Sequence, residues 1–303
     1  MKFLITGSNG LLGQKIIYEL LQSTGNEIIA ASKGRGRISV KDGYIYEPLD
    51  ITDENAVMQL VQKHQPDCII NTAAMTNVDA CEVDKDGCKK INIDAVQYLV
   101  NAAEKVKAHF VHLSTDFVFD GLNGPYKEED VPNPLSYYAW SKLESERIVQ
   151  SAKVKWAILR TIIIYGVVDD AQRSNVVLWT KSSLEQHKPI NVISDQIRSP
   201  TLAEDLANAC INAGLKNAQG IYHVSGKETM SILDVAYFVA DFFKLDKSYI
   251  KPITTSELNQ AAKRPLVTGF IIDKAIRELD YHPHSLAEGL EIVAEQLNKK
   301  VGS

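Results

Sequence analysis

Tyr138 and Lys142 stand four residues apart in a stretch with helical spacing, and together they could carry acid–base chemistry. Residues with this spacing on a helix project from the same face, so the phenol and the ammonium can share one site. A nearby positive charge favours the phenolate, lowers the tyrosine pKa and makes proton exchange with a substrate oxygen feasible. The same spacing arises about once by chance in a chain of this kind, and the bland alternative is a helix-surface pair. The catalytic interpretation of the pair therefore depends on the motifs around it.

The elements that must position this pair follow from hydrophobic periodicity in the first half of the chain. Short apolar runs alternate there with amphipathic stretches, which predicts βαβ units and a doubly wound parallel (Rossmann) sheet in an α/β fold. The predicted strands are 2–6, 27–31, 67–71, 109–114 and 156–160, and the predicted helices are 11–21, 54–64, 94–106 and 136–152.

Beyond about Val167 the alternation loosens. Helical spacing recurs and two short runs look extended, so we expect a smaller, helix-rich C-terminal lobe that binds substrate. The predicted helices are 174–186, 202–213, 232–243, 273–279 and 286–297, and the extended runs are 190–193 and 221–224. We therefore divide the chain into a Rossmann domain, 1–168, and a lobe, 169–303, with 202–224 a candidate to return to the sheet.

A glycine-rich segment, 7–13, directly follows the first predicted strand and opens the first predicted helix. Glycines in this position permit a tight turn and let a pyrophosphate approach the backbone, while the helix N-terminus supplies N–H groups. The alternative is a β–α turn without a ligand. The nucleotide-binding interpretation predicts contacts from Gly7, Asn9, Gly10, Leu11, Leu12 and Gly13.

The choice of nicotinamide cofactor depends on the end of the second strand. Sites that prefer NAD usually carry an acid about 20 residues after the glycine loop. No acid occurs here between Glu27 and Asp42, and cations follow the strand instead. Cations suit a 2′-phosphate, so NADP(H) is favoured and NAD(H) remains possible; the alternative is a solvated basic loop. The residues expected around the adenosine half are Ser32, Lys33, Arg35, Asp50 and Ile51.

Composition narrows the class of protein. The chain has 303 residues, 45% of them hydrophobic and 23% charged, with a net charge of -5. This balance is typical of a globular protein and argues against nucleic acid or an anionic membrane as the main partner. The four cysteines lack C-x-x-C spacing, which favours reduced thiols over a disulfide framework or a metal site. With only six residues before Gly7 and no long apolar run, we expect a soluble, cytoplasmic protein.

Several motifs together resemble the extended short-chain dehydrogenase/reductase superfamily. Besides the glycine loop and the Tyr138/Lys142 pair, they are Asn-Thr-Ala-Ala-Met-Thr-Asn-Val-Asp at 71–79 and Ser-Thr-Asp-Phe-Val-Phe-Asp-Gly at 114–121. The second of these, 195–201 and Arg264-Pro265 resemble the dTDP-4-dehydrorhamnose reductase branch. The resemblance covers nearly the whole chain.

The resemblance implies a catalytic set of Thr115, Tyr138 and Lys142. Thr115 would polarise a substrate carbonyl, Tyr138 would donate a proton to its oxygen, and Lys142 would hold the nicotinamide ribose. It also implies cofactor contacts from Ala73, Ala74, Thr76 and Asn92, although Asn92 could equally support the site from behind or cap a helix.

The substrate residues are a weaker inference. Arg198 is a candidate for a nucleotide diphosphate because its guanidinium fork matches phosphate oxygens, and a structural salt bridge is the alternative. The branch commonly has a Trp after the sixth strand, where this chain has Ile162–Ile164, so the identity of the sugar is open. The candidate substrate residues are Val78, Asp116, Phe117, Ile163 and Arg198.

The implied function is NADPH-dependent reduction of a nucleotide-linked 4-keto-6-deoxysugar. A nucleotide-sugar epimerase or dehydratase is the alternative within enzymes. The regulatory β-subunit of methionine adenosyltransferase, an NADP-binding partner protein, resembles the same branch and supplies a non-catalytic alternative. Helices 94–106 and 136–152 commonly form a dimer interface in the superfamily, so a homodimer is expected.

Overall fold

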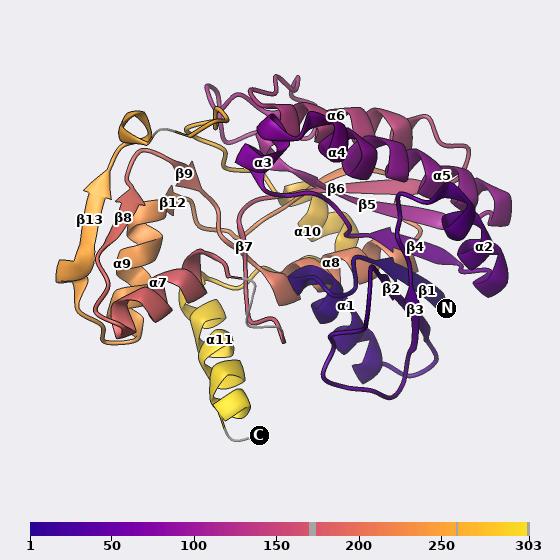
Figure 1. The fold of residues 1–303 in the computed structure, drawn as a ribbon, viewed down its shortest axis with the longest axis horizontal. Coiled ribbons are helices and arrows are strands. Elements are labelled where there is room, and N and C mark those ends of the chain that lie inside the picture. Colours follow the sequence, from indigo (N-terminus) through magenta and orange to yellow (C-terminus); the bar gives the residue numbers. More distant parts are fainter. Residues whose placement is uncertain (170–173, 259, 302–303) are drawn as a thin grey trace.

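A seven-stranded, fully parallel sheet forms the centre of the molecule in the order β11-β6-β5-β4-β1-β2-β3 (Figure 1). The computed structural model describes residues 1–169, 174–258 and 260–301. The predicted α/β fold with a doubly wound parallel sheet is confirmed. The strands are β1 (Lys2–Thr6), β2 (Glu27–Ser32), β3 (Ile45–Pro48), β4 (Cys68–Asn71), β5 (His109–Thr115), β6 (Trp156–Thr161) and β11 (Gly220–Val224).

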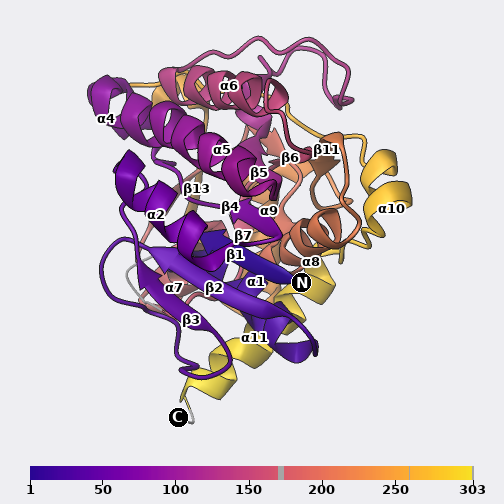
Figure 2. The same ribbon diagram turned by 90° about the vertical axis from the view of Figure 1, so that its right-hand side faces the viewer.

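Helices cover both faces of this sheet (Figure 2). Neighbouring residues of a strand point to opposite faces, so Phe3 and Ile5 of β1 join one core cluster and Leu4 joins the other. Both faces must therefore be apolar, which explains the continuous apolar runs of the strands. One face is covered by α1 (Leu11–Gln22), α8 (Ala203–Leu215) and α10 (Asp273–Leu279), the other by α2 (Glu54–His64), α5 (Ala95–Val106) and α6 (Tyr137–Gln150).

The parallel register brings the carboxyl ends of the central strands to one edge. Thr6 lies opposite Asn71, and Asn71 lies opposite His112. These three buried side chains are hydrogen-bonded in a row, with Thr6 Oγ1 2.7 Å from Asn71 Oδ1 and Asn71 Nδ2 3.2 Å from His112 Nδ1. The loops after β1, β4 and β5 consequently leave the sheet side by side, which is where ligands bind in open α/β sheets.

The rest of the chain builds smaller units beside the sheet (Figure 1). Val177, Val235 and Leu290 contribute to a separate apolar core among its helices. These helices are α7 (Val176–Glu185), α9 (Ile232–Phe242) and α11 (Leu286–Val301). Three two-stranded pairs accompany them: β7 (Ile164–Tyr165) with β10 (Thr201–Leu202), β8 (Ile190–Ile193) with β13 (Ile250–Ile253), and β9 (Ile197–Arg198) with β12 (Met230–Ser231).

The segment 202–224 packs on the central sheet, apart from the segments that flank it in sequence. α8 packs against α1, and β11 pairs with β6 at the edge of the central sheet. Several short helices escaped the sequence prediction because they span one or two turns only. They are α3 (Val78–Val83), α4 (Lys85–Lys89), η1 (Lys90–Asp94), η2 (Asp116–Val118), η3 (Lys247–Tyr249) and η4 (Thr255–Glu257). Among the described residues, no helix is both long and apolar enough to cross a membrane.

Candidate active site

A continuous groove runs along the carboxyl edge of the sheet in three connected cavities of about 500, 850 and 540 Å³. The first and second cavities share Gly10, Thr72 and Ala74. The second and third share Thr115 and Tyr138, among other residues. The groove thus joins the glycine loop at one end to the C-terminal segments at the other. We call its parts the first, central and third cavities.

The glycine loop has the close backbone packing that its sequence predicts. Gly7 has a φ of +71°, and a Cβ atom there would lie 2.7 Å from the Ala73 nitrogen. A Cβ at Gly13 would lie 2.5 Å from the Gly7 carbonyl oxygen. Gly10 is the N-cap of α1, so the first N–H groups of that helix open onto the groove without helical partners. The loop residues that line the groove are Gly7, Asn9, Gly10, Leu11, Leu12 and Gly13.

The first cavity collects most residues expected around an adenosine. Lys33 and Asp50 both line it and form an ion pair, with the ammonium 2.7 Å from the carboxylate. The hydrogen bond from Lys33 lowers the pKa of Asp50 to about 2, so this carboxylate is ionised at neutral pH. Arg35 is exposed and does not line the cavity; its backbone carbonyl accepts a hydrogen bond from Asn9 Nδ2 at 2.9 Å. The other lining residues predicted from sequence are Ser32, Ile51, Ala73 and Ala74.

Thr115, Tyr138 and Lys142 meet at the central cavity, as do Ala74 and Thr76. Ser136 caps α6 by accepting a hydrogen bond from the Ala139 nitrogen at 3.3 Å, which fixes where the helix begins. Tyr138 and Lys142 are therefore one turn apart on the face of α6 that packs on the sheet, and both are buried. Thr115 ends β5, and its hydroxyl accepts from the Phe117 nitrogen at 3.2 Å. Three segments thus converge on one point of the groove.

Burial dominates the electrostatics of the Tyr138–Lys142 pair. Burial raises the pKa of Tyr138 above its ordinary value, and only a hydrogen bond with Thr115 opposes this. The Lys142 ammonium donates to the Leu113 carbonyl at 2.6 Å and lies 3.3 Å from His112 Nε2. The expectation that Lys142 lowers the pKa of Tyr138 is wrong, because the lysine is held against β5 and desolvation of the phenol outweighs it. Tyr138 is accordingly a protonated acid at neutral pH.

Lys142 itself is perturbed in the direction that burial requires. Burial lowers its pKa to about 8, and the Glu146 carboxylate, one turn further along α6, opposes the shift. Glu146 is in turn neutralised by Arg160 of β6, at 2.7 Å between Nη2 and Oε2. Because this carboxylate already has a partner, it compensates the ammonium only partly. The lysine thus titrates close to neutrality.

Asn92 lies behind the groove rather than in it, which corrects its assignment as a cofactor contact. Its side-chain amide binds both backbone groups of Met75, accepting at 2.8 Å and donating at 3.0 Å. Nδ2 also lies 3.0 Å from Ser141 Oγ on α6. The residue therefore fixes the loop after β4 against α6, which is the supporting role left open by the sequence. It sits in the π-helical turn η1 and caps no helix there.

The third cavity contains all five candidate substrate residues. Tyr138 and Thr115 stand at its inner end, where it meets the central cavity. Most of the wall is apolar, including the indole of Trp179 from α7. The candidates that line it are Val78, Asp116, Phe117, Ile163 and Arg198.

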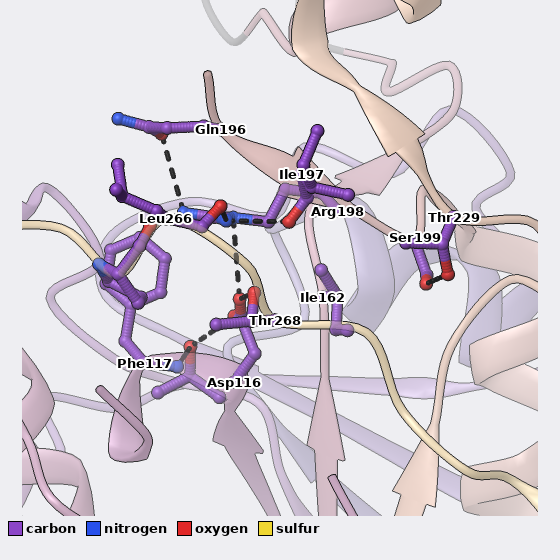
Figure 3. Close-up of polar contacts among 12 residues, drawn as sticks. Asp116, Phe117, Ile162, Gln196, Ile197, Arg198, Ser199, Thr229, Leu266 and Thr268 are labelled. Atoms are coloured by element: carbon purple, nitrogen blue, oxygen red, sulfur yellow. Dashed lines mark hydrogen bonds and ion pairs between the residues drawn. The ribbon is translucent and has the colours of Figure 1, made fainter. Parts of the chain in front are cut away.

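Arg198 is occupied by the protein, which favours the structural alternative over a free diphosphate ligand. Nη1 donates to the carbonyls of Ile197 and Leu266, at 2.8 and 2.9 Å (Figure 3). Nη2 donates to that of Pro265 at 2.6 Å. Nε lies 3.6 Å from the Asp116 carboxylate. The second arginine of this wall, Arg264, is likewise paired, with Asp79 at 2.7 Å.

Ile163 stands where the central and third cavities join, in an unusual backbone conformation. Its φ is +23°, which is rare for a β-branched residue. Thr201 holds it there: its nitrogen donates to the Ile163 carbonyl at 3.2 Å, and its hydroxyl donates to that of Ile162 at 2.6 Å. Strain of this kind persists only where the surrounding structure imposes it, commonly at functional sites.

Among the groove residues that were not predicted from the sequence, two bear on function. Thr161 ends β6 in the central cavity, and its buried hydroxyl has no hydrogen-bond partner among the described residues. The position of Thr161 after a buried strand could have marked it. Trp179 reaches the third cavity from α7, and no local pattern distinguishes it from other residues of an amphipathic helix.

Comparison with known proteins places this groove in a family. Methionine adenosyltransferase 2 subunit beta of Bos taurus is 35% identical over 269 residues, which cover 87% of this chain and 78% of that protein. A dTDP-4-dehydrorhamnose reductase from Clostridium acetobutylicum has a similar structure, with a TM-score of 0.85 and 32% identity over 98% of this chain and all of that one. A dTDP-4-dehydrorhamnose reductase from Bacillus anthracis, solved in complex with NADP, gives a TM-score of 0.82 and 28% identity over 97% of this chain and 99% of that one.

The family model described as the RmlD substrate binding domain matches residues 1–299, nearly the entire chain. This protein therefore belongs to the RmlD substrate-binding domain family.

Proposed function

We propose that this protein reduces the 4-keto group of a nucleotide-linked 6-deoxysugar with NADPH, in the manner of a dTDP-4-dehydrorhamnose reductase. One observation carries the proposal: Thr115 and Tyr138 line both the central and the third cavity. A carbonyl placed at this junction would meet a hydroxyl and a protonated phenol together. The reductases from Clostridium acetobutylicum and Bacillus anthracis support the assignment.

The groove residues fit a dinucleotide. Glycines at positions 7 and 13 allow the backbone to pack where any Cβ would clash, and the free N–H groups of α1 suit a pyrophosphate. The hydroxyl of Thr161, which has no partner within the described part of the chain, offers a hydrogen bond to a carboxamide. Lys33 and Arg35, exposed near the first cavity, would pair with a 2′-phosphate, which favours NADPH over NADH. The bound cofactor would supply hydride to the carbonyl carbon.

Residues of the chain itself would donate the proton to the substrate oxygen and orient the carbonyl. Burial keeps the Tyr138 phenol protonated, so it can give its proton to the substrate oxygen as negative charge develops there. Thr115 would hold the same oxygen by a hydrogen bond that orients the carbonyl. Lys142 would hold the nicotinamide ribose through its Nζ.

The direct test measures NADPH oxidation with dTDP-4-dehydro-6-deoxy-L-mannose. We expect turnover by the wild-type protein, with NADH as a poorer donor. Tight NADPH binding without turnover would reject this substrate and favour another sugar or a binding role.

A non-catalytic role is the second candidate, because subunit beta of methionine adenosyltransferase 2 is 35% identical to this chain. The occupied guanidinium groups of Arg198 and Arg264 also favour it, since a diphosphate would need at least one of them to change partners. Co-elution with a methionine adenosyltransferase catalytic subunit in size-exclusion chromatography would support this role. We also propose a cytoplasmic homodimer, supported by four free cysteines and by the adjacent helices α5 and α6.

A further inference from the structure

Asp116 is a buried carboxylate that connects the active site to the C-terminal segments (Figure 3). Its Oδ1 accepts a hydrogen bond from Thr115 Oγ1 at 3.1 Å. Its Oδ2 accepts one from Thr268 and lies 3.6 Å from Arg198 Nε. Because Arg198 also binds the carbonyls around Leu266, three segments far apart in sequence meet at this one carboxylate.

The Thr115 hydroxyl has a single proton, and the geometry decides where it points. The oxygen already accepts a hydrogen bond from the Phe117 nitrogen. When Asp116 is ionised, the Thr115 proton is directed to Oδ1 and is unavailable to a substrate in the groove. When Asp116 is protonated, donors surround Oδ2, so the acid proton resides on Oδ1 and is donated to Thr115. The hydroxyl proton of Thr115 is then free to point into the groove.

We propose that Asp116 is a positioning residue whose protonation state switches the Thr115 hydroxyl between facing the carboxylate and facing the substrate oxygen. This inference rests on the proposed carbonyl reduction, because only a substrate oxygen needs the Thr115 proton. It adds a requirement to the set of Thr115, Tyr138 and Lys142. The Thr115 hydroxyl must first be released from Asp116 before it can donate to the substrate oxygen.

The surroundings of Asp116 fit such a switch. Arg198 from β9 is a charged group that faces it, and Tyr138 from α6 is a titratable group that interacts with its charge. Burial raises the pKa of Asp116 above its ordinary value, and Arg198, Thr268 and Thr115 oppose this shift. The pKa of this carboxyl group is thereby closer to the pH range in which an enzyme is assayed, while its hydrogen-bond partners stay in place.

Asp116→Asn tests the switch, because the amide reproduces the protonated acid. Its oxygen can accept from Thr268 and Arg198, and its N–H can donate to Thr115 at every pH. We expect kcat/KM of the wild type to fall, by roughly 10²-fold, as pH rises through the Asp116 pKa, and this decline to be absent in Asp116→Asn. Superimposable pH profiles, or a folded Asp116→Asn protein inactive at every pH, would overturn the proposal.

An infrared titration without substrate separates this inference from the proposed function. The carbonyl stretch of protonated Asp116 is the band present in wild type and missing in Asp116→Asn. Thr115→Val and Thr268→Val each remove a donor to the carboxylate, so the midpoint of that band should move to higher pH. Thr229→Val is the matched control, since Thr229 pairs with Ser199 at 2.9 Å outside this cluster (Figure 3). A midpoint unaffected by Thr115→Val would refute the coupling even if the enzyme turns over.

Discussion

Two lysines that line the groove, Lys33 and Lys142, lie in opposite environments. Lys33, beside the first cavity, has a side chain that is 82% exposed, whereas Lys142 in the central cavity is 3% exposed. An exposed ammonium keeps its hydration and can be exchanged between partners at little cost. A buried one loses its hydration, so its charge depends on the few groups that touch it. Exposed cations therefore suit selection of a cofactor, and the buried one suits control of protonation.

Tyr138→Phe should have the largest effect, because Tyr138 is the proposed proton donor and lies in the buried central part of the groove. Removing the phenolic O–H takes away the hydroxyl that would protonate the substrate oxygen at the junction of the cavities. We expect kcat to fall roughly 10³-fold while NADPH binding is retained. Tyr137→Phe is the matched control: Tyr137 contacts Trp140 and lies outside the groove. Undiminished turnover by Tyr138→Phe would remove the proton-donor role.

Lys142→Met should stabilise the protein, measured without added cofactor. Folding lowers the lysine pKa from 10.5 to about 8, so the buried ammonium is destabilising below pH 8. This cost of about 3 kcal/mol disappears as pH rises from 8 to 10.5, because the unfolded chain then loses the proton too. Urea unfolding of wild type and Lys142→Met across this range measures the difference.

Lys33→Met serves as the exposed counterpart of that experiment and should change the unfolding free energy little. A stability difference between wild type and Lys142→Met that does not shrink above pH 8 would contradict the assigned cost of burial.

Substitutions beside the exposed first cavity should change cofactor binding and not the chemical step. Lys33→Ala combined with Arg35→Ala should raise the Kd for NADPH roughly tenfold and leave that for NADH unchanged, since only NADPH carries the 2′-phosphate. Fluorescence titration with both cofactors measures this. Lys63→Ala is the control, because Lys63 is also exposed and paired with a carboxylate, Glu47 at 2.6 Å, but does not line the first cavity. Equal weakening for NADH would reject the selection argument.

The smallest effect should come from the outer wall of the third cavity. Trp179→Ala removes an indole from this wall, and we expect the KM for the nucleotide sugar to rise roughly fivefold with kcat unchanged. Trp140→Ala is matched closely, because both indoles are 38% exposed and Trp140 lies on α6 outside the groove. Equal changes in the two variants would show that Trp179 does not contact substrate.

Features that neighbouring residues set could be predicted from the sequence, and features that depend on distant contacts could not. The glycine loop and the Tyr138–Lys142 spacing are local patterns on regular elements, so their placement on the groove could be read from the chain. Asn92 and Arg198 were harder, because the sequence shows that each can form several hydrogen bonds but not with which partners. The structure directs Asn92 to Met75 and Arg198 to the carbonyls around Leu266. Short helices such as α3 were missed because one or two turns carry no periodic signal.

The sequence by itself determined the parallel sheet, the glycine loop and the helix face that presents Tyr138 and Lys142, because periodicity and spacing are properties of neighbouring residues. Only the tertiary structure decided the charges and contacts at that site. It buried Lys142 against Leu113 and raised the pKa of Tyr138. It also brought Trp179, Arg198 and Thr268 to residues far away in the chain. Desolvation and long-range pairing depend on which segments meet, and that is fixed by packing of the whole chain.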